Sequence, residues 1–178
     1  LRIRKLEWEA RQAKQEREEL RSALERLAEQ VGIVDLYHDN LTNHEHAVDY
    51  WHDHYGVSYE MIAKRKLGYC QRCPLAPHSD SLTIPVFYRG ELKNIKHRLL
   101  NPDRRGRYRP HISGLPNVLY NADDVHRSSD KLLIVEGEIK SIVISDRTNH
   151  LNVGTSGMQG FDPAWAPFIK KQFPLVYV

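Results

Sequence analysis

The chain has 178 residues, 40% of them hydrophobic, and a net charge of +3. This length and composition can bury a sizeable core, so one domain with an appendage is expected. No apolar run of about 18 residues and no signal peptide is evident, which argues against a membrane or secreted protein and favours a cytoplasmic one. Two cysteines in a chain of this size exclude a disulfide framework.

Residues 1–31 carry a heptad pattern that is interrupted only by Arg17, and Gly32 follows as a stop signal. The pattern predicts one long helix of roughly 46 Å at 1.5 Å per residue. Acidic and basic residues nearly balance along it, so two interpretations stand. The apolar stripe packs on the body of this protein, or the helix forms a coiled coil or interdomain connector that permits self-association. The stripe consists of Ile3, Leu6, Ala10, Ala13, Arg17, Leu20, Leu24, Leu27 and Val31.

A second helix is predicted from Thr42 to Tyr55, because Thr42 and Glu45 have the spacing of a capping box and Gly56 follows. Ser58 then predicts the cap of a short helix over 59–66. The second helix carries four histidines on several faces, which favours a polar helix face over a metal site. These histidines are His44, His46, His52 and His54.

Cys70 and Cys73 form a C-x-x-C pair, with His78 five residues further on. A structural zinc site needs four ligands, and the sequence shows no second pair that would complete one. The pattern therefore favours two unligated thiols over a zinc site.

Residues 82–100 predict a β-hairpin that turns at Arg89-Gly90, and Pro85 places its first strand at an edge of the sheet or at the start of a strand. From Arg89 to Arg109 the chain has eight Lys or Arg and two acidic residues, while the remainder carries a net charge of −3. Such concentrated charge, with tyrosines available for stacking, fits a groove for a single-stranded nucleic-acid backbone. It fits an ordinary solvated basic loop equally well.

The stretch from Lys131 to Ser141 organises the last third of the chain. Residues 132–135 form an apolar run that predicts a strand buried on both faces, and Glu136 follows at its carboxyl end. A helix over 138–147, a strand near 150–153, a glycine loop at 154–157, a helix after Asp162-Pro163 and an apolar run at 175–178 complete the order β-α-β-α-β. This order predicts a parallel sheet with Glu136 and the glycine loop at one edge. A solvated turn residue is the alternative interpretation of Glu136.

The sequence Leu-Ile-Val-Glu-Gly-Glu at 133–138, with this continuation, resembles the Toprim domain of primases and topoisomerases, particularly that of phage and plasmid primases. The resemblance implies that Glu136 is a catalytic residue and a ligand of Mg²⁺ or Mn²⁺, together with an Asp-x-Asp on a later strand. That motif would fall just past Val178, so the chain is expected to be an inactive piece of a longer protein. Lys140 stands where many relatives carry an aspartate.

The segment from about Leu41 to Asn121 resembles the polymerase domain of the same primases. The matching features are the glycine turn at Gly90, the strand arginine Arg98, the Arg107-Tyr108 pair, where relatives usually have Lys-Tyr, and the segment that ends at Asn121. In that family such basic residues hold the template strand and nucleotide phosphates. The implied binding residues are Lys96, Arg98, Arg107, Tyr108 and Arg109, with Lys93, Arg104, Arg105, Lys140 and Gly154 as additional ones.

These observations predict an α/β protein in three parts. Residues 1–32 form the long helix, 33–128 a mixed α+β platform for DNA that contains the hairpin, and 129–178 an incomplete parallel βαβαβ Toprim domain. The resemblance implies a phage-type or bacterial DNA primase that makes short RNA primers from nucleoside triphosphates on single-stranded DNA. A replicative helicase, fused or separate, would be a partner, and zinc would occupy only a separate upstream domain.

Two other functions are compatible with the sequence. A Toprim nuclease would use the same glutamate and metal to cleave strands, although such nucleases lack a region like 41–121. A non-catalytic nucleic-acid-binding or helicase-binding module is the second alternative.

Overall fold

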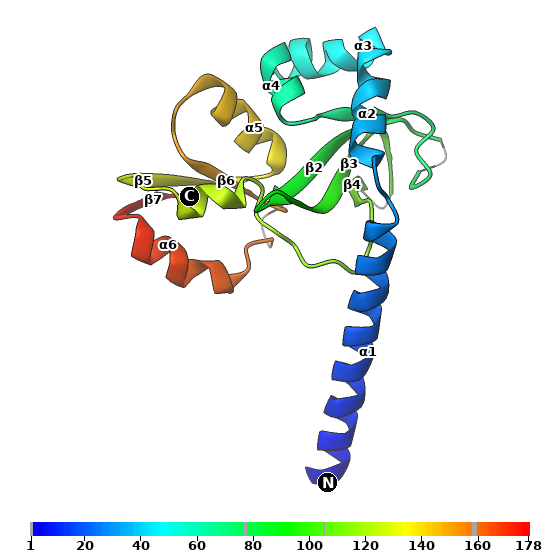
Figure 1. The fold of residues 1–178 in the computed structure, drawn as a ribbon, viewed down its shortest axis with the longest axis vertical. Coiled ribbons are helices and arrows are strands. Elements are labelled where there is room, and N and C mark those ends of the chain that lie inside the picture. Colours follow the sequence, from blue (N-terminus) through cyan, green and yellow to red (C-terminus); the bar gives the residue numbers. More distant parts are fainter. Residues whose placement is uncertain (1, 77, 105, 158–159) are drawn as a thin grey trace.

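The computed structural model describes residues 2–76, 78–104, 106–157 and 160–178. A long helix projects from a body that is built around two β-sheets (Figure 1). No helix in the described part of the chain is both long enough and apolar enough to cross a membrane.

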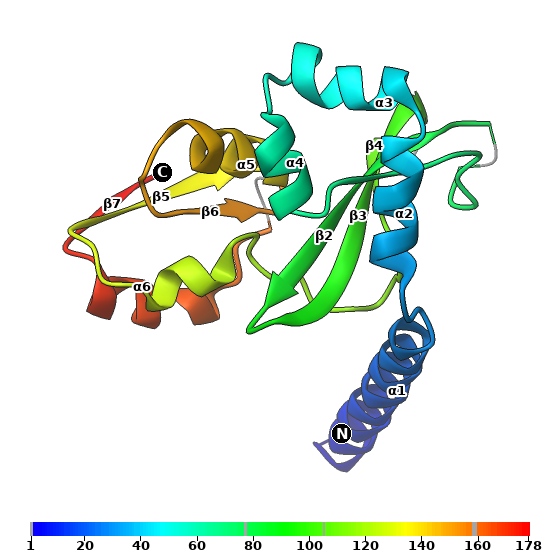
Figure 2. The same cartoon turned by 45° about the horizontal axis from the view of Figure 1, so that its top comes forward.

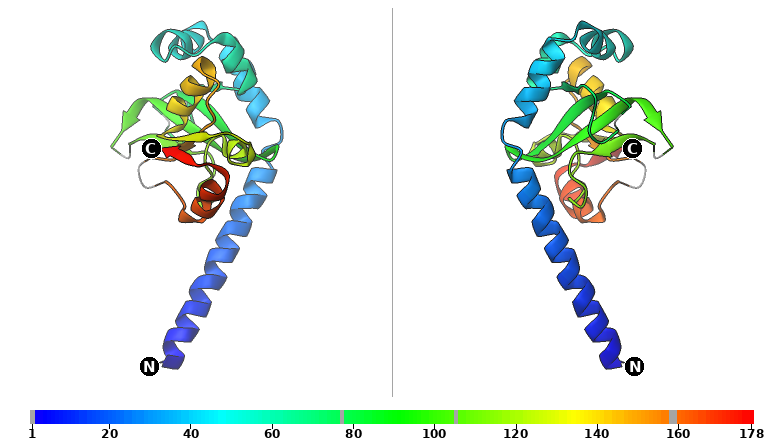
Figure 3. Two further views of the ribbon diagram at one scale, coloured as in Figure 1. Left: turned by 90° about the vertical axis from the view of Figure 1, so that its left-hand side faces the viewer. Right: turned by 90° about the vertical axis from the view of Figure 1, so that its right-hand side faces the viewer.

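The projecting helix, α1 (Arg2–Ala28), extends away from the body in every view (Figures 1 and 3). Leu6 and Leu24 of its apolar stripe are 57% and 51% exposed. Near the carboxyl end of α1, Ala23 is fully buried, and the Arg26 guanidinium donates a hydrogen bond of 3.2 Å to the Ser113 carbonyl. The interpretation that the stripe packs along the body is therefore wrong for most of α1, and the coiled-coil or connector interpretation stays a prediction.

The first sheet is antiparallel, with the strand order β1-β2-β3-β4. The predicted hairpin turn is confirmed, because Arg89 and Gly90 both have positive φ angles (53° and 76°), as tight two-residue turns require. The edge position predicted from Pro85 is wrong, since β2 lies inside the sheet. β1 pairs with β2 only as far as Thr83, so the missing N–H of Pro85 costs no hydrogen bond on that side. The strands are β1 (Gly68–Cys70), β2 (Ser81–Tyr88), β3 (Glu91–Asp103) and β4 (Gly106–Pro110).

Short helices cover this sheet at one end (Figure 2). The predicted capping box is wrong, because Thr42 ends a helix and its hydroxyl donates to the Asp39 carbonyl at 2.8 Å. Ser58 is confirmed as a cap, since its hydroxyl oxygen accepts the Met61 N–H at 3.1 Å. The helices are α2 (Ile33–Thr42), α3 (Glu45–Asp49), the π-helix η1 (Tyr50–His54) and α4 (Tyr59–Lys64).

The second sheet is parallel, with the order β6-β5-β7, and it confirms the predicted β-α-β-α-β arrangement. One helix lies on each side of it, α5 above and α6 below in the views of Figures 1 and 2. The burial on both faces predicted for residues 132–135 is wrong, because Leu132 alone is buried in β5. The edge strand β7 is exposed along its length. The elements are η2 (Ala122–His126), β5 (Lys131–Glu136), α5 (Glu138–Arg147), β6 (Asn152–Thr155), η3 (Pro163–Trp165), α6 (Ala166–Gln172) and β7 (Leu175–Tyr177).

The two sheets share one packed body. Trp51 and Ile84 from the first part of the chain lie in the same apolar cluster as Tyr120 and Ile142 of α5. Polar contacts add to this, because the Asp146 carboxylate accepts hydrogen bonds from the N–H and hydroxyl groups that begin α4, at 2.7 and 2.5 Å. The boundaries predicted at residues 32 and 128 stay predictions.

Candidate nucleic-acid and nucleotide cleft

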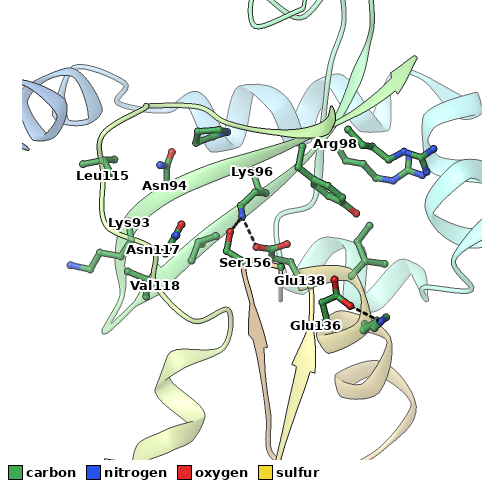
Figure 4. Close-up of a pocket in the computed structure, with 18 of the residues that line it drawn as sticks. Lys93, Asn94, Lys96, Arg98, Leu115, Asn117, Val118, Glu136, Glu138 and Ser156 are labelled. Carbon is green, nitrogen blue, oxygen red and sulfur yellow. Dashed lines mark hydrogen bonds and ion pairs between the residues drawn. The ribbon is translucent and has the colours of Figure 1, made fainter. Parts of the chain in front are cut away.

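A cleft of about 710 Å³ opens between the antiparallel sheet and the amino end of α5 (Figure 4). Its lining contains five basic and two acidic residues, so positive charge surrounds a smaller number of carboxylates. An excess of this kind favours anionic ligands such as phosphates. The charged lining residues are Lys93, Lys96, Arg98, Arg107, Lys140, Glu136 and Glu138.

Glu136 lies at the rim of this cleft, as the last residue of β5. The backbone turns at Gly137, whose φ of 90° favours glycine, and α5 begins directly afterwards. The Glu136 side chain is 53% exposed, and its Oε2 lies 3.7 Å from the Lys140 Nζ one helical turn later. Because the pair is long and exposed, it holds the carboxylate only weakly.

Glu138 is a second acidic residue of the cleft that sequence reasoning missed. Its side chain is 7% exposed, and its Oε1 lies 3.0 Å from the Nζ of Lys96, which is 17% exposed. Lys96 also hydrogen-bonds to the hydroxyl of Ser156 (Figure 4). The pair therefore ties β3 to the parallel sheet. The Glu-Gly-Glu tripeptide at 136–138 shows both glutamates, but an argument based on the end of the strand selects only the first one.

Arg98 is 3% exposed and lines the cleft. Its guanidinium carbon lies 5.1 Å from the ring centroids of both Tyr50 and Tyr55, a double cation–π contact. Burial raises the pKa of Tyr55 to about 12, so this ring stays neutral. Within the described part of the chain, Nε and Nη1 of Arg98 have no hydrogen-bond partner. Each unsatisfied buried donor costs about 1–3 kcal/mol.

Of the three predicted residues on β4, two line the cleft and one does not. Arg107 and Tyr108 line the cleft, and burial raises the pKa of Tyr108 above its ordinary value. Arg109 pairs with His97 in the β3–β4 register and is not among the residues that line the cleft. The Arg109 Nη1 donates to two main-chain carbonyls of its own strand at 2.9 Å.

The additional predicted residues are also divided. Lys93 and Lys140 line the cleft, whereas Arg104 lies in the exposed turn after β3. Gly154 is buried in β6, where a Cβ would meet the Gly137 carbonyl oxygen at 2.8 Å, so close packing explains it. Arg105 lies outside the described residues.

A second polar cluster lies on the opposite face of β3. The sulfurs of Cys70 and Cys73 and a ring nitrogen of His97 are buried and lie within 4.8 Å of one another. The cysteines are free, and a hydrogen bond from Cys70 lowers the pKa of Cys73. His78, the histidine suggested by the sequence, is exposed and lies outside this group. That the thiols are unligated stays a prediction.

The histidines before residue 55 make local contacts. His44 Nδ1 lies 2.7 Å from the Asn40 carbonyl, and His46 Nε2 lies 3.2 Å from the Tyr69 hydroxyl. His52 stacks on Tyr59, and the His54 ring lies tilted against Tyr50 with the ring centroids 4.7 Å apart. In the part of the chain that the structure describes, these four do not bring three ligand atoms together.

No protein-family model and no curated protein sequence matches the chain. Its fold is similar to the zinc-binding and RNA polymerase domains of the Aquifex aeolicus primase, with a TM-score of 0.66 and 16% identity over 91% of this chain and 47% of that one. The E. coli primase catalytic core gives 0.63 and 15% over 82% and 58%, and a DnaG primase catalytic domain bound to single-stranded DNA gives 0.63 and 14% over 92% and 63%. The chain thus spans less than two thirds of each. Its fold is that of part of the DnaG primase catalytic core.

Proposed function

We propose that this chain is the part of a DNA primase that binds the template strand and the incoming nucleotide. The proposal rests on one observation: Glu136 shares a cleft with Lys96, Arg98 and Arg107. Nucleotidyl transfer needs a carboxylate for divalent metal and cationic groups for phosphates in one place. The fold supports the proposal, because one similar structure is a primase catalytic domain bound to single-stranded DNA.

The basic residues would hold phosphates. Arg98 is suited to this role because it lines the cleft and a planar guanidinium can bind two phosphate oxygens at once. Arg107 is exposed and can follow the strand backbone. Tyr108 is 43% exposed and offers a face on which a base can stack.

Glu136 fits a site for Mg²⁺ or Mn²⁺. Mg²⁺ is usually bound by one or two carboxylates together with water and substrate phosphates. The half-exposed Glu136 carboxylate meets this requirement, while the Glu138 carboxylate is already engaged with Lys96. When bound, the ion would supply charge neutralisation for the reacting triphosphate.

The reaction would join a primer 3′ hydroxyl to the α-phosphate of the incoming nucleotide, and pyrophosphate would leave. Lys96 and Arg98 would orient the phosphates, and Glu136 would lie beside the reacting groups as metal ligand or as base. A helicase partner, fused or separate, belongs to this proposal through the family resemblance alone.

The test is primer synthesis by the full-length protein on single-stranded DNA, with Mg²⁺ and Mn²⁺ compared. Glu136→Gln should lower synthesis by about 100-fold or more, because several kcal/mol of charge stabilisation are lost. Binding of single-stranded DNA, measured by fluorescence anisotropy, should change little. Glu16→Gln on the exposed face of α1 is the matched control.

Three outcomes would contradict the proposal. Full synthesis by Glu136→Gln would remove the catalytic role of this residue, provided that the wild-type protein is active. Cleavage of the template by the wild type, without synthesis, would favour the nuclease. DNA binding by the wild type without either reaction would favour the non-catalytic module. Equal loss of synthesis and binding in the variant would show misfolding, which circular dichroism distinguishes.

A further inference from the structure

Four polar side chains meet in the closed space between the antiparallel sheet and α2. Cys70 ends β1, Cys73 follows the next turn, Ser81 begins β2 and His97 lies inside β3. Their exposed fractions are 4%, 0%, 0% and 0%. The antiparallel pairing of β1, β2 and β3 therefore gathers these side chains out of water.

The atoms that face one another in this cluster are all metal-binding atoms. The Nδ1 of His97 lies 3.3 Å from the Cys73 Sγ and 2.9 Å from the Ser81 Oγ. Zinc–sulfur and zinc–nitrogen bonds in a tetrahedral site place neighbouring ligand atoms about 3.6–3.8 Å apart. The thiols and the imidazole lie within 4.8 Å of one another, and the 3.3 Å between Cys73 Sγ and His97 Nδ1 is slightly shorter than that separation. Small shifts of the side chains would therefore reach it.

The surroundings hold the ligand groups in position. The Nε2 of His97 lies 3.0 Å from the Nδ1 of His111, and the two rings stack with centroids 5.2 Å apart. The Tyr37 ring packs edge-on against His97, with the ring centroids 5.5 Å apart. Metal-binding histidines characteristically have their second ring nitrogen fixed by such a hydrogen bond.

We propose that Cys70, Cys73 and His97 bind a structural Zn²⁺ ion, with the Ser81 hydroxyl as the oxygen donor at the fourth position. Two thiolates balance the charge of the ion, so the occupied cluster is neutral and its burial costs little. Thiolate and imidazole ligands suit zinc and do not suit Mg²⁺ or Ca²⁺. The ion would join the loop between β1 and β2 to β3. This proposal is independent of the proposed function.

The first experiment measures zinc by mass spectrometry in the full chain, purified under reducing conditions. The wild type should hold about one more zinc per chain than Cys73→Ser. The difference between the two makes the result independent of zinc bound elsewhere. Cys70→Ser and His97→Gln should lose the same ion. His78→Gln, a change in an exposed histidine of the adjoining loop, should keep it.

A second experiment does not depend on how well the variants fold. Wild-type protein is stripped with a chelator, and Co²⁺ is added as a spectroscopic probe. Charge-transfer absorption from thiolate to cobalt and the visible bands of tetrahedral cobalt are expected. Ser81→Ala should keep the charge-transfer band and shift the visible bands. The proposal is overturned if wild type and Cys73→Ser contain equal zinc and cobalt gives no charge-transfer band, or if the thiols only form a disulfide without taking up metal.

Discussion

The two faces of β3 differ in their surroundings, one lining an open cleft and the other a closed interior. Lys96 and Arg98 line the open cleft, whereas Ile95, His97 and Leu99 face an interior in which they are 1%, 0% and 0% exposed. In the cleft, Arg98 keeps donors without partners in the described chain, while the groups around His97 bond to one another. Strand alternation thus lets a dry, packed face fix the position of residues that face a ligand.

The largest effect is expected on stability, from breaking the ion pair between Lys96 and Glu138 in the cleft. Lys96→Met leaves the Glu138 carboxylate buried without its partner, and the free energy of unfolding should fall by about 3–5 kcal/mol. Urea denaturation measures this loss, and the double change Lys96→Met with Glu138→Met should recover most of it. Lys93→Met is the control, because its pair with Glu91 is exposed and should contribute no more than about 1 kcal/mol. Equal effects of Lys96→Met and Lys93→Met would show that the cleft is as solvated as the surface.

An intermediate effect is expected at Arg98. Arg98→Ala should weaken binding of single-stranded DNA by about 10- to 100-fold at low salt, since charged hydrogen bonds contribute about 1.5–3 kcal/mol. Arg98→Lys keeps the charge but loses the planar fork, so its affinity should lie between the two. Fluorescence anisotropy gives the affinities, and a thermal melt of each variant checks that the fold is retained. Unchanged affinity of Arg98→Ala would remove this residue from the binding site.

The smallest effect is expected at Arg107 and Arg109 of β4, for which the sequence predicted the same role in binding. Arg107→Gln should weaken DNA binding a few-fold and reduce the slope of log affinity against log salt by about 1, as loss of one phosphate contact does. Arg109→Gln should change both quantities less, because Arg109 does not line the cleft. Equal effects would mean that the DNA also contacts Arg109, outside the cleft.

The parallel sheet and the hairpin could be predicted from the sequence because their signals are local. Apolar runs, glycine turns and helical periodicity lie within a few residues of the elements that they define. The strand β4 could not be predicted, since an arginine-rich stretch is also typical of a solvated loop. The burial of Arg98 could not be predicted either, because it depends on two tyrosines that are distant in the sequence. Glu138 was missed because its partner Lys96 lies on β3, far from α5 in the sequence, so no local pattern shows the pair.

The cysteine cluster teaches the same lesson about distance along the chain. Sequence proximity pointed to His78, five residues after Cys73, as the nearest histidine. The structure instead brings His97 beside the cysteines, because β2 pairs Ser81 with Cys70 on one side and Thr83 with His97 on the other, and these two residues share a face of β2. A register of this kind depends on the packing of the whole sheet, so no local pattern reports it.

The wide winding of η1 determines how Arg98 is held. Tyr50 and Tyr55 are five positions apart, and an ordinary α-helix would rotate such residues about 140° away from each other. The i to i+5 turn of a π-helix brings both rings to the same side, where each makes a cation–π contact with the Arg98 guanidinium. The double cation–π contact therefore depends on the number of residues in one helical turn. Deleting a single non-tyrosine residue of η1 would rotate one ring away from the Arg98 guanidinium, although both tyrosines would still be present.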